Sequence, residues 1–292
     1  MKILSDFDGV WTDPRKEADA ILTYLIEAAA RAARVPLDEA RADFAGFLEL
    51  VNATPSRFGW APDGWITGYV DEDPLLLSSG LGMLLEQIGS SKGQGDSPRA
   101  ARYRDGILQH HESLASFTDS CFREATTKFL ATEPNQLSKS ARRLLAGWLE
   151  VGAEVVVVSN SGANKLVRWF QEHDIDAREV AGGELRVRGH AEKYRIGSEA
   201  GALEFSGRRI YVDRPRYRAA LEEEQADVVI GDVFSLDLAL PYVLRRDELP
   251  GAPKTLILKR HKHTPPWVLA LGGEGPIDHM VDSLDQVPAL LA

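Results

Sequence analysis

The chain has 292 residues, 44% of them apolar, so it is long enough to bury a large core and to form two domains. Its 34 basic and 44 acidic residues give a formal net charge of -10, which argues against a broad nucleic-acid-binding surface. No apolar run approaches the roughly 18 residues of a membrane helix, and the single cysteine cannot form an internal disulfide. We therefore expect a cytoplasmic protein without nucleic-acid or membrane partners.

The first segment of the chain is a short apolar run, residues 1–5, followed by Asp6, Asp8 and Gly9. The run predicts a buried strand. Two carboxylates at its end repel each other, so folding them together requires a compensating cation or a shared proton. Gly9 allows the backbone to turn sharply after them. This combination predicts a metal-assisted reaction site.

Residues 14–136 are predicted to form a helical domain that is inserted after the first strand. Segments rich in good helix formers predict helices over residues 14–34, 37–51 and 99–131. The stretch 89–97 is rich in Gly and Ser and predicts a flexible connection.

Three further apolar runs predict strands over residues 154–159, 227–231 and 255–259. Each run is nearly continuous, as expected for strands that are covered on both faces of a parallel sheet. Helical patterns alternate with these strands, over residues 137–151, 164–173 and 215–225. The alternation predicts the α/β class, a Rossmann-like doubly wound parallel sheet built from residues 1–13 and 137–292. Sites in such sheets lie at the carboxyl ends of the strands.

The predicted strands at residues 154–159 and 227–231 also end in polar residues. Ser159 and Asn160 end one strand, and Asp232 and Asp237 follow the other. A hydroxyl group and turn amides at a helix start suit an anionic oxygen. With the two acids after the first strand, four carboxylates are expected at one edge of the sheet. Hard oxygen ligands without a cysteine cluster favour Mg²⁺.

These motifs resemble those of the haloacid dehalogenase (HAD) superfamily. DFDGV at residues 6–10 is similar to the family's first motif, VVVVSN at 155–160 to its second, and GDVFSLD at 231–237 to its fourth. Val10 and Trp11 stand where the family commonly has Thr and Leu. The resemblance covers the sheet domain, and it implies that the helical insertion is a cap between the first and second motifs.

The resemblance implies a phosphohydrolase that acts on a small phosphorylated metabolite through an aspartyl-phosphate intermediate. Asp6 is implied as the nucleophile, and Asp8 as the general acid and base. The implied ligands of Mg²⁺ are Asp6, the backbone carbonyl of Asp8, Asp232 and Asp237. The implied phosphate-binding groups are Ser159 and the amide of Asn160.

The family's third motif, a basic residue that neutralises the phosphate, has two candidates in this chain. Lys193 falls in the expected interval. Arg214 precedes Pro215 at the start of a predicted helix, where the family often has Lys-Pro. The sequence leaves both open.

Three other functions are compatible with parts of this pattern. Carbon–halogen hydrolysis also uses an aspartate nucleophile, but that branch of the family lacks the second aspartate, so Asp8 argues against it. Phosphotransfer to a second substrate, as in a mutase, uses the same intermediate and stays open. A non-catalytic binding protein of the same fold is expected to have lost Asp6, Asp8 or Asp232, and all three are present. The oligomeric state and the individual substrate are not specified by the sequence.

Residues 259–263, with the sequence KRHKH, follow the last predicted strand and are the densest positive cluster in the chain. Because that strand should end at the same edge of the sheet as the acids, we expect this loop to lie beside them. Two interpretations stay open: the charge of this loop attracts anionic substrates to the site, or the loop is an ordinary solvated surface segment.

Overall fold

The computed structural model describes residues 1–89, 97–133, 135–198 and 201–291. The chain divides into two units, which we call the sheet unit (Met1–Asp13 and Asn135–Ala292) and the helical unit (Pro14–Pro134). The helical unit is inserted between two segments of the sheet unit. These two segments lie side by side, since Thr12 and Leu137 form an isolated antiparallel bridge. Most of the predicted connection at 89–97 lies outside the described residues.

The sheet unit contains a seven-stranded sheet within the described residues, and its paired strands all run parallel. The strand order is β11-β10-β9-β1-β4-β6-β5, which confirms the predicted Rossmann-like α/β class. The strands are β1 (Lys2–Ser5), β4 (Glu154–Val158), β5 (Ala177–Arg178), β6 (Leu185–Arg188), β9 (Val228–Gly231), β10 (Thr255–Lys259) and β11 (His279–Val281).

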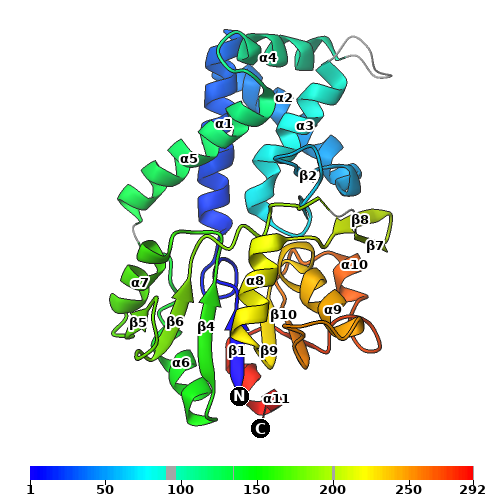
Figure 1. The fold of residues 1–292 in the computed structure, drawn as a ribbon. Coiled ribbons are helices and arrows are strands. Elements are labelled where there is room, and N and C mark those ends of the chain that lie inside the picture. Colours follow the sequence, from blue (N-terminus) through cyan, green and yellow to red (C-terminus); the bar gives the residue numbers. More distant parts are fainter. Residues whose placement is uncertain (90–96, 134, 199–200, 292) are drawn as a thin grey trace. The chain divides into compact units, whose positions relative to one another are not determined.

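The central strands are apolar because both of their faces are covered. Every residue of β9 is buried, and so are the four valines of β4. Figure 1 shows α8, in yellow, in front of these strands. The helices of the sheet unit are α6 (Ala141–Glu150), α7 (Ala163–Gln171), α8 (Pro215–Glu224), α9 (Ala239–Arg246), α10 (Pro266–Leu269) and α11 (Val287–Leu291). A separate antiparallel hairpin pairs β7 (Ala202–Phe205) with β8 (Arg208–Tyr211).

Aromatic side chains fix the segment that follows β1. The Trp11 ring packs edge-on against Trp148 of α6 and Phe170 of α7, at centroid distances of 5.2 and 5.4 Å. Its indole N–H donates to Ser5 Oγ at 3.0 Å. Such edge-to-face pairs add about 0.5–1.5 kcal/mol beyond the burial of area. Trp11 thus ties the turn after β1 to two helices.

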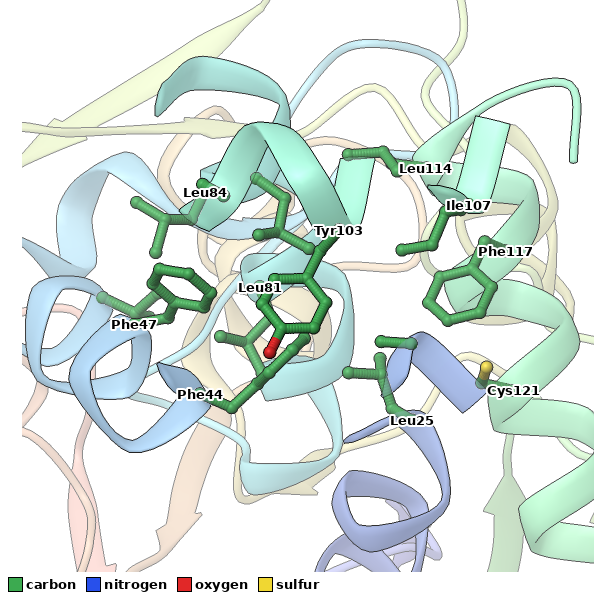
Figure 2. Close-up of a cluster of buried hydrophobic side chains, with 14 of the residues drawn as sticks. Leu25, Phe44, Phe47, Leu81, Leu84, Tyr103, Ile107, Leu114, Phe117 and Cys121 are labelled. Carbon is green, nitrogen blue, oxygen red and sulfur yellow. The ribbon is translucent and has the colours of Figure 1, made fainter. Parts of the chain in front are cut away.

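The helical unit has an apolar core of its own, part of which is shown in Figure 2. The rings of Phe44, Phe47 and Tyr103 pack edge-to-face in it. The Tyr103 hydroxyl donates to the buried carboxylate of Asp43 at 2.9 Å. The elements are α1 (Arg15–Ala33), α2 (Leu37–Ala53), α3 (Leu77–Gly89), α4 (Pro98–Leu108) and α5 (Leu114–Thr132), with the hairpin strands β2 (Gly59–Trp60) and β3 (Gly68–Tyr69) and the short helices η1 (Pro55–Arg57) and η2 (Pro74–Leu76).

The prediction of one helix over residues 99–131 was wrong, because the structure divides this segment into α4 and α5. A capping box starts α5: the Ser116 N–H donates to Ser113 Oγ at 3.0 Å, and the Ser113 N–H donates to Ser116 Oγ at 3.2 Å. These bonds satisfy amides that a continuous helix would have paired internally. Helix α3 was not predicted from the sequence.

None of the helices in the described parts of the chain combines the length and the apolarity that a membrane crossing requires.

Candidate active site

The carboxyl edge of the sheet brings the predicted acids together. Strands β1 and β9 are neighbours, with Ser5 opposite Ile230. The Asp6 N–H continues this ladder by donating to the Ile230 carbonyl at 2.8 Å, which places Asp6 beside the turn that carries Asp232. Asp237 lies on a π-helical turn, Phe234–Leu238, that directly follows this turn.

Asp6, Asp232 and Asp237 form a compact acidic cluster. One carboxylate oxygen from each lies within 4.8 Å of the other two, and all three side chains are buried. The Val233 N–H donates to Asp237 Oδ2 at 3.1 Å. Three buried carboxylates in such a space are stable as anions only if cations compensate their charge.

Lys193 supplies part of this compensation. Its ammonium group donates to Asp237 Oδ1 at 2.8 Å and is also paired with Asp6 Oδ1. The Lys193 side chain is itself buried, and it lies over the Tyr217 ring. Burial alone would lower the pKa of Lys193, but the facing carboxylates of Asp237 and Asp6 raise it above its ordinary value. The facing carboxylates therefore favour the charged form of this lysine within the cluster.

The loop that carries Lys193 is bonded to the end of β4. The Ala191 N–H donates to the Ser159 carbonyl at 3.0 Å, and the Lys193 N–H donates to Asn160 Oδ1 at 2.8 Å. Two non-glycine residues in this loop, His190 and Glu192, have positive φ angles of 55° and 46°. Such conformations are costly, and they persist where the surrounding structure holds them, often at functional sites.

Arg214, the other candidate for the third motif, binds backbone carbonyls. Its guanidinium donates to the carbonyls of Tyr211 at 3.1 Å and Ser235 at 2.9 Å, and also to the carbonyl of Lys193. Arg214 is completely buried. Lys193 therefore faces the acidic cluster, whereas Arg214 holds the Lys193 loop and the Asp237 turn.

Asp8 and Ser159 form a second, less buried part of the site. The Ser159 hydroxyl donates to Asp8 Oδ2 at 3.4 Å, and its oxygen accepts a hydrogen bond from the Ser161 N–H at 3.0 Å. Asp8 is only half-buried, whereas Ser159 is fully buried. The side chain of Asp8 is not part of the three-acid cluster found among the described residues.

Burial changes the ionisation of the acidic cluster. Burial, followed by the charge of Asp237, raises the pKa of Asp6 and of Asp232 well above their ordinary values, although the charge of Lys193 opposes the change. If all three carboxylates are ionised, one lysine leaves two negative charges uncompensated. One divalent cation would neutralise them.

We predict that the metal-free protein loses stability as the pH rises from about 4 toward neutrality. Because the folded-state pKa of Asp6 and Asp232 is raised, the folded protein binds more protons than the unfolded chain in this range, and its stability falls with pH. Melting temperatures in EDTA at several pH values would show this decline, and Mg²⁺ should oppose it. The decline should be smaller in Asp232→Asn, and an identical decline in that variant would contradict the prediction.

The donor set fits a divalent cation such as Mg²⁺. Asp232 Oδ1 is buried and has no hydrogen-bond partner among the described residues. A buried carboxylate oxygen without a partner is costly unless an ion or a water molecule binds it. The other available donors are carboxylate oxygens, which Mg²⁺ prefers.

Two glycines make room for the acidic cluster. Gly9 has a positive φ of 79°, and a Cβ added to it would overlap the Asp232 carboxylate. A Cβ added to Gly231 would overlap Asp237. Each glycine thus permits a close approach to one of the acids, which the motif in the sequence did not reveal.

Gly9→Ala is expected to displace the Asp232 carboxylate and to weaken Mg²⁺ binding strongly. The new methyl group would take the volume of the carboxylate, and alanine is strained at this φ. Titration calorimetry with Mg²⁺ would measure the loss. Gly64→Ala is a matched control, because Gly64 also has a positive φ, of 82°, but an added Cβ would have nothing within 4 Å. Equal Mg²⁺ affinity in Gly9→Ala and wild type would contradict the expected effect.

A cavity of about 340 Å³ lies within the helical unit, and none of the acids above lines it. Its walls include Arg31, His110, His111 and Cys121. Burial raises the pKa of the Cys121 thiol to about 12, so this cysteine stays protonated and unreactive at neutral pH.

No family model matches the sequence, and no curated protein matches it. Among solved structures, the chain is similar to the magnesium-bound HAD-hydrolase YfnB from Bacillus subtilis, with a TM-score of 0.42 and 11% identity over 99% of this chain and 97% of that chain. It is also similar to CbbY from Rhodobacter sphaeroides in complex with phosphate, with a TM-score of 0.42 and 14% identity over 98% of this chain and 95% of that chain.

Proposed function

We propose that this chain, whose motifs resemble those of the HAD superfamily, is a Mg²⁺-dependent phosphohydrolase that acts on a small phosphomonoester. The observation that carries the proposal is the convergence of Asp6, Asp232, Asp237 and Lys193 within one buried cluster. Separate strands and loops contribute these residues, and capping or solvation of each acid alone does not explain their common burial.

In the proposed reaction, an oxygen of Asp6 attacks phosphorus and displaces the alcohol oxygen of the substrate. Asp6 suits this role because it lies at the end of a central strand and faces a fixed ammonium group. The product of this step is an acyl phosphate on Asp6. Nucleophilic catalysis of this type divides one difficult displacement into two easier ones.

Asp8 would move the proton in both halves of the reaction. In the first half it gives its proton to the departing alcohol oxygen. In the second half it takes a proton from a water molecule, which attacks phosphorus, releases inorganic phosphate and restores the Asp6 carboxylate. Asp8 is less buried than Asp6, so both water and a leaving group can reach it.

The remaining groups would bind the phosphoryl oxygens and the metal. Lys193, the Ser159 hydroxyl and the backbone amide of Asn160 are the proposed phosphate contacts, and Asn160 Oδ1 also holds the Lys193 backbone. Mg²⁺ would be held by Asp6, the Asp8 carbonyl, Asp232 and Asp237, and when bound it supplies positive charge that lets a carboxylate approach an anionic phosphate.

We propose a small phosphorylated metabolite as the substrate class. The helical unit is inserted directly after the segment that carries Asp6 and Asp8, which is the position of a cap in the family that the motifs resemble. Caps in such enzymes exclude water and select the substrate.

A phosphate-release screen over a panel of phosphorylated metabolites tests the proposal. We expect Mg²⁺-dependent release from at least one small phosphomonoester and none in EDTA. Release that is unaffected by EDTA would contradict the metal requirement. Transfer of the phosphoryl group to an added alcohol in preference to water would identify a phosphotransferase instead.

A further inference from the structure

The loop after β10 brings an imidazole to one of the proposed metal ligands. Strand β10 pairs with β9 so that Leu258 lies opposite Gly231. The residues after β10 therefore reach the same edge of the sheet as Asp232. His261 Nε2 lies 3.3 Å from Asp232 Oδ2, and the His261 side chain is only 18% exposed.

Backbone and side-chain contacts fix the position of this imidazole. The His261 backbone N–H donates to Thr264 Oγ1 at 2.8 Å, and the Thr264 backbone N–H donates to the His261 carbonyl at 3.2 Å. The ring is stacked on His263, with a centroid distance of 4.9 Å and an interplanar angle of 4°. Arg260 binds both carboxylate oxygens of Asp282, at 2.6 and 2.7 Å. The loop is thus held on both sides of His261.

The two oxygens of Asp232 have different surroundings. Oδ2 faces His261 Nε2 and is the atom closest to the position of a Cβ on Gly9. Oδ1 is buried without a hydrogen-bond partner among the described residues. A protein side chain thus approaches Oδ2, whereas Oδ1 has no partner among the described residues.

We propose that His261 is a positioning residue for the metal site: it holds Asp232 Oδ2 so that Oδ1 is presented to Mg²⁺. The proposal rests on the proposed function, since it assumes that Asp232 binds the metal. With the proton on Nε2, a small rotation of the side chain completes a hydrogen bond to Oδ2. Partners of this kind orient metal-binding carboxylates, and their loss typically lowers metal affinity or activity about 10–100-fold.

His261 acts through Asp232 in this proposal and is not itself a ligand. In the described parts of the chain, the group of potential ligand atoms within 4.8 Å of one another contains the three acids and not His261. The loop at residues 259–263 was expected to attract anionic substrates by its charge. In the structure, Arg260 is paired with Asp282, and His261 faces the carboxylate of Asp232.

Titration calorimetry with Mg²⁺ on the metal-stripped full chain, at about pH 8, which is above the ordinary pKa of an imidazole, tests the proposal. His261→Phe keeps a ring that can stack on His263 but has no donor, and we expect its Mg²⁺ affinity to fall about tenfold. His261→Gln keeps a donor and should restore most of the affinity. Lys262→Ala, an exposed change in the same loop, is the matched control and should bind Mg²⁺ like wild type.

A purely structural role would lower the melting temperature of the metal-free protein and leave the Mg²⁺ affinity of the folded protein unchanged. Equal affinity in His261→Phe and wild type would therefore overturn the proposal, as would an equal loss in His261→Phe and His261→Gln. Should His261→Phe fail to fold, His261→Leu gives the same comparison. A wild-type chain that binds no Mg²⁺ would instead refute the proposed function.

Discussion

Asp6→Asn is expected to lower kcat by roughly 10⁴-fold or more, as removal of a catalytic nucleophile typically does. The amide has nearly the same shape as the carboxylate, but it is a poor nucleophile and cannot form a stable acyl phosphate. The measurement is phosphate release under saturating substrate and Mg²⁺.

The variant should remain folded, because burial already favours the neutral form of the Asp6 carboxyl group and the asparagine amide is neutral as well. Its melting temperature in EDTA should therefore equal or exceed that of wild type. Asp247→Asn is the control: this aspartate is exposed, and the same change there should leave kcat unaltered. Activity of Asp6→Asn close to that of wild type would exclude Asp6 as the nucleophile.

Lys193→Met is expected to destabilise the metal-free protein by about 3–5 kcal/mol, the usual cost of removing one partner of a buried ion pair. The methionine fills a similar volume, but it leaves Asp6 and Asp237 without their shared cation. Urea unfolding at neutral pH in EDTA would measure the loss.

A second substitution distinguishes charge from packing in this result. Asp237→Asn combined with Lys193→Met removes one of the two carboxylates that have lost their cation, so the double variant should recover part of the lost stability. Lys262→Met, at an exposed lysine, should have little effect. A Lys193→Met protein as stable as wild type would show that the lysine does not compensate the buried acids.

The central part of the fold could be predicted from the sequence because its strands are continuous apolar runs. The run at 255–259 coincides with β10, and the run at 154–159 contains β4. These runs are buried on both faces, so their composition reflects their environment directly. The carboxyl ends of the strands then located the acids that the structure brings together.

The peripheral strands could not be recognised in the same way. Strand β5 has two residues and β6 alternates buried and half-buried positions, LRVR, with two arginines. One of these, Arg188, binds the buried Glu224 at 2.8 Å, which is a long-range contact that no local pattern reveals. Short or charged strands are defined by their neighbours rather than by their own composition.

The choice between Lys193 and Arg214 also depended on tertiary structure. Lys193 falls in the expected interval and Arg214 precedes Pro215 at a predicted helix start, and both are buried in the structure. The difference comes from the loop with positive φ at His190 and Glu192, which directs Lys193 to the acids. Likewise, His261 could be predicted as part of a basic loop, but its approach to Asp232 follows from the register of β10 with β9.

The central claim, that Asp6 carries the phosphoryl group, is tested most directly by trapping the intermediate. The protein is mixed with a substrate and Mg²⁺, quenched in acid and reduced with borohydride, which converts an aspartyl phosphate to homoserine. Peptide mass spectrometry should then find homoserine at position 6 and not in samples lacking substrate. Homoserine at another aspartate, or turnover without modification at position 6, would contradict the account.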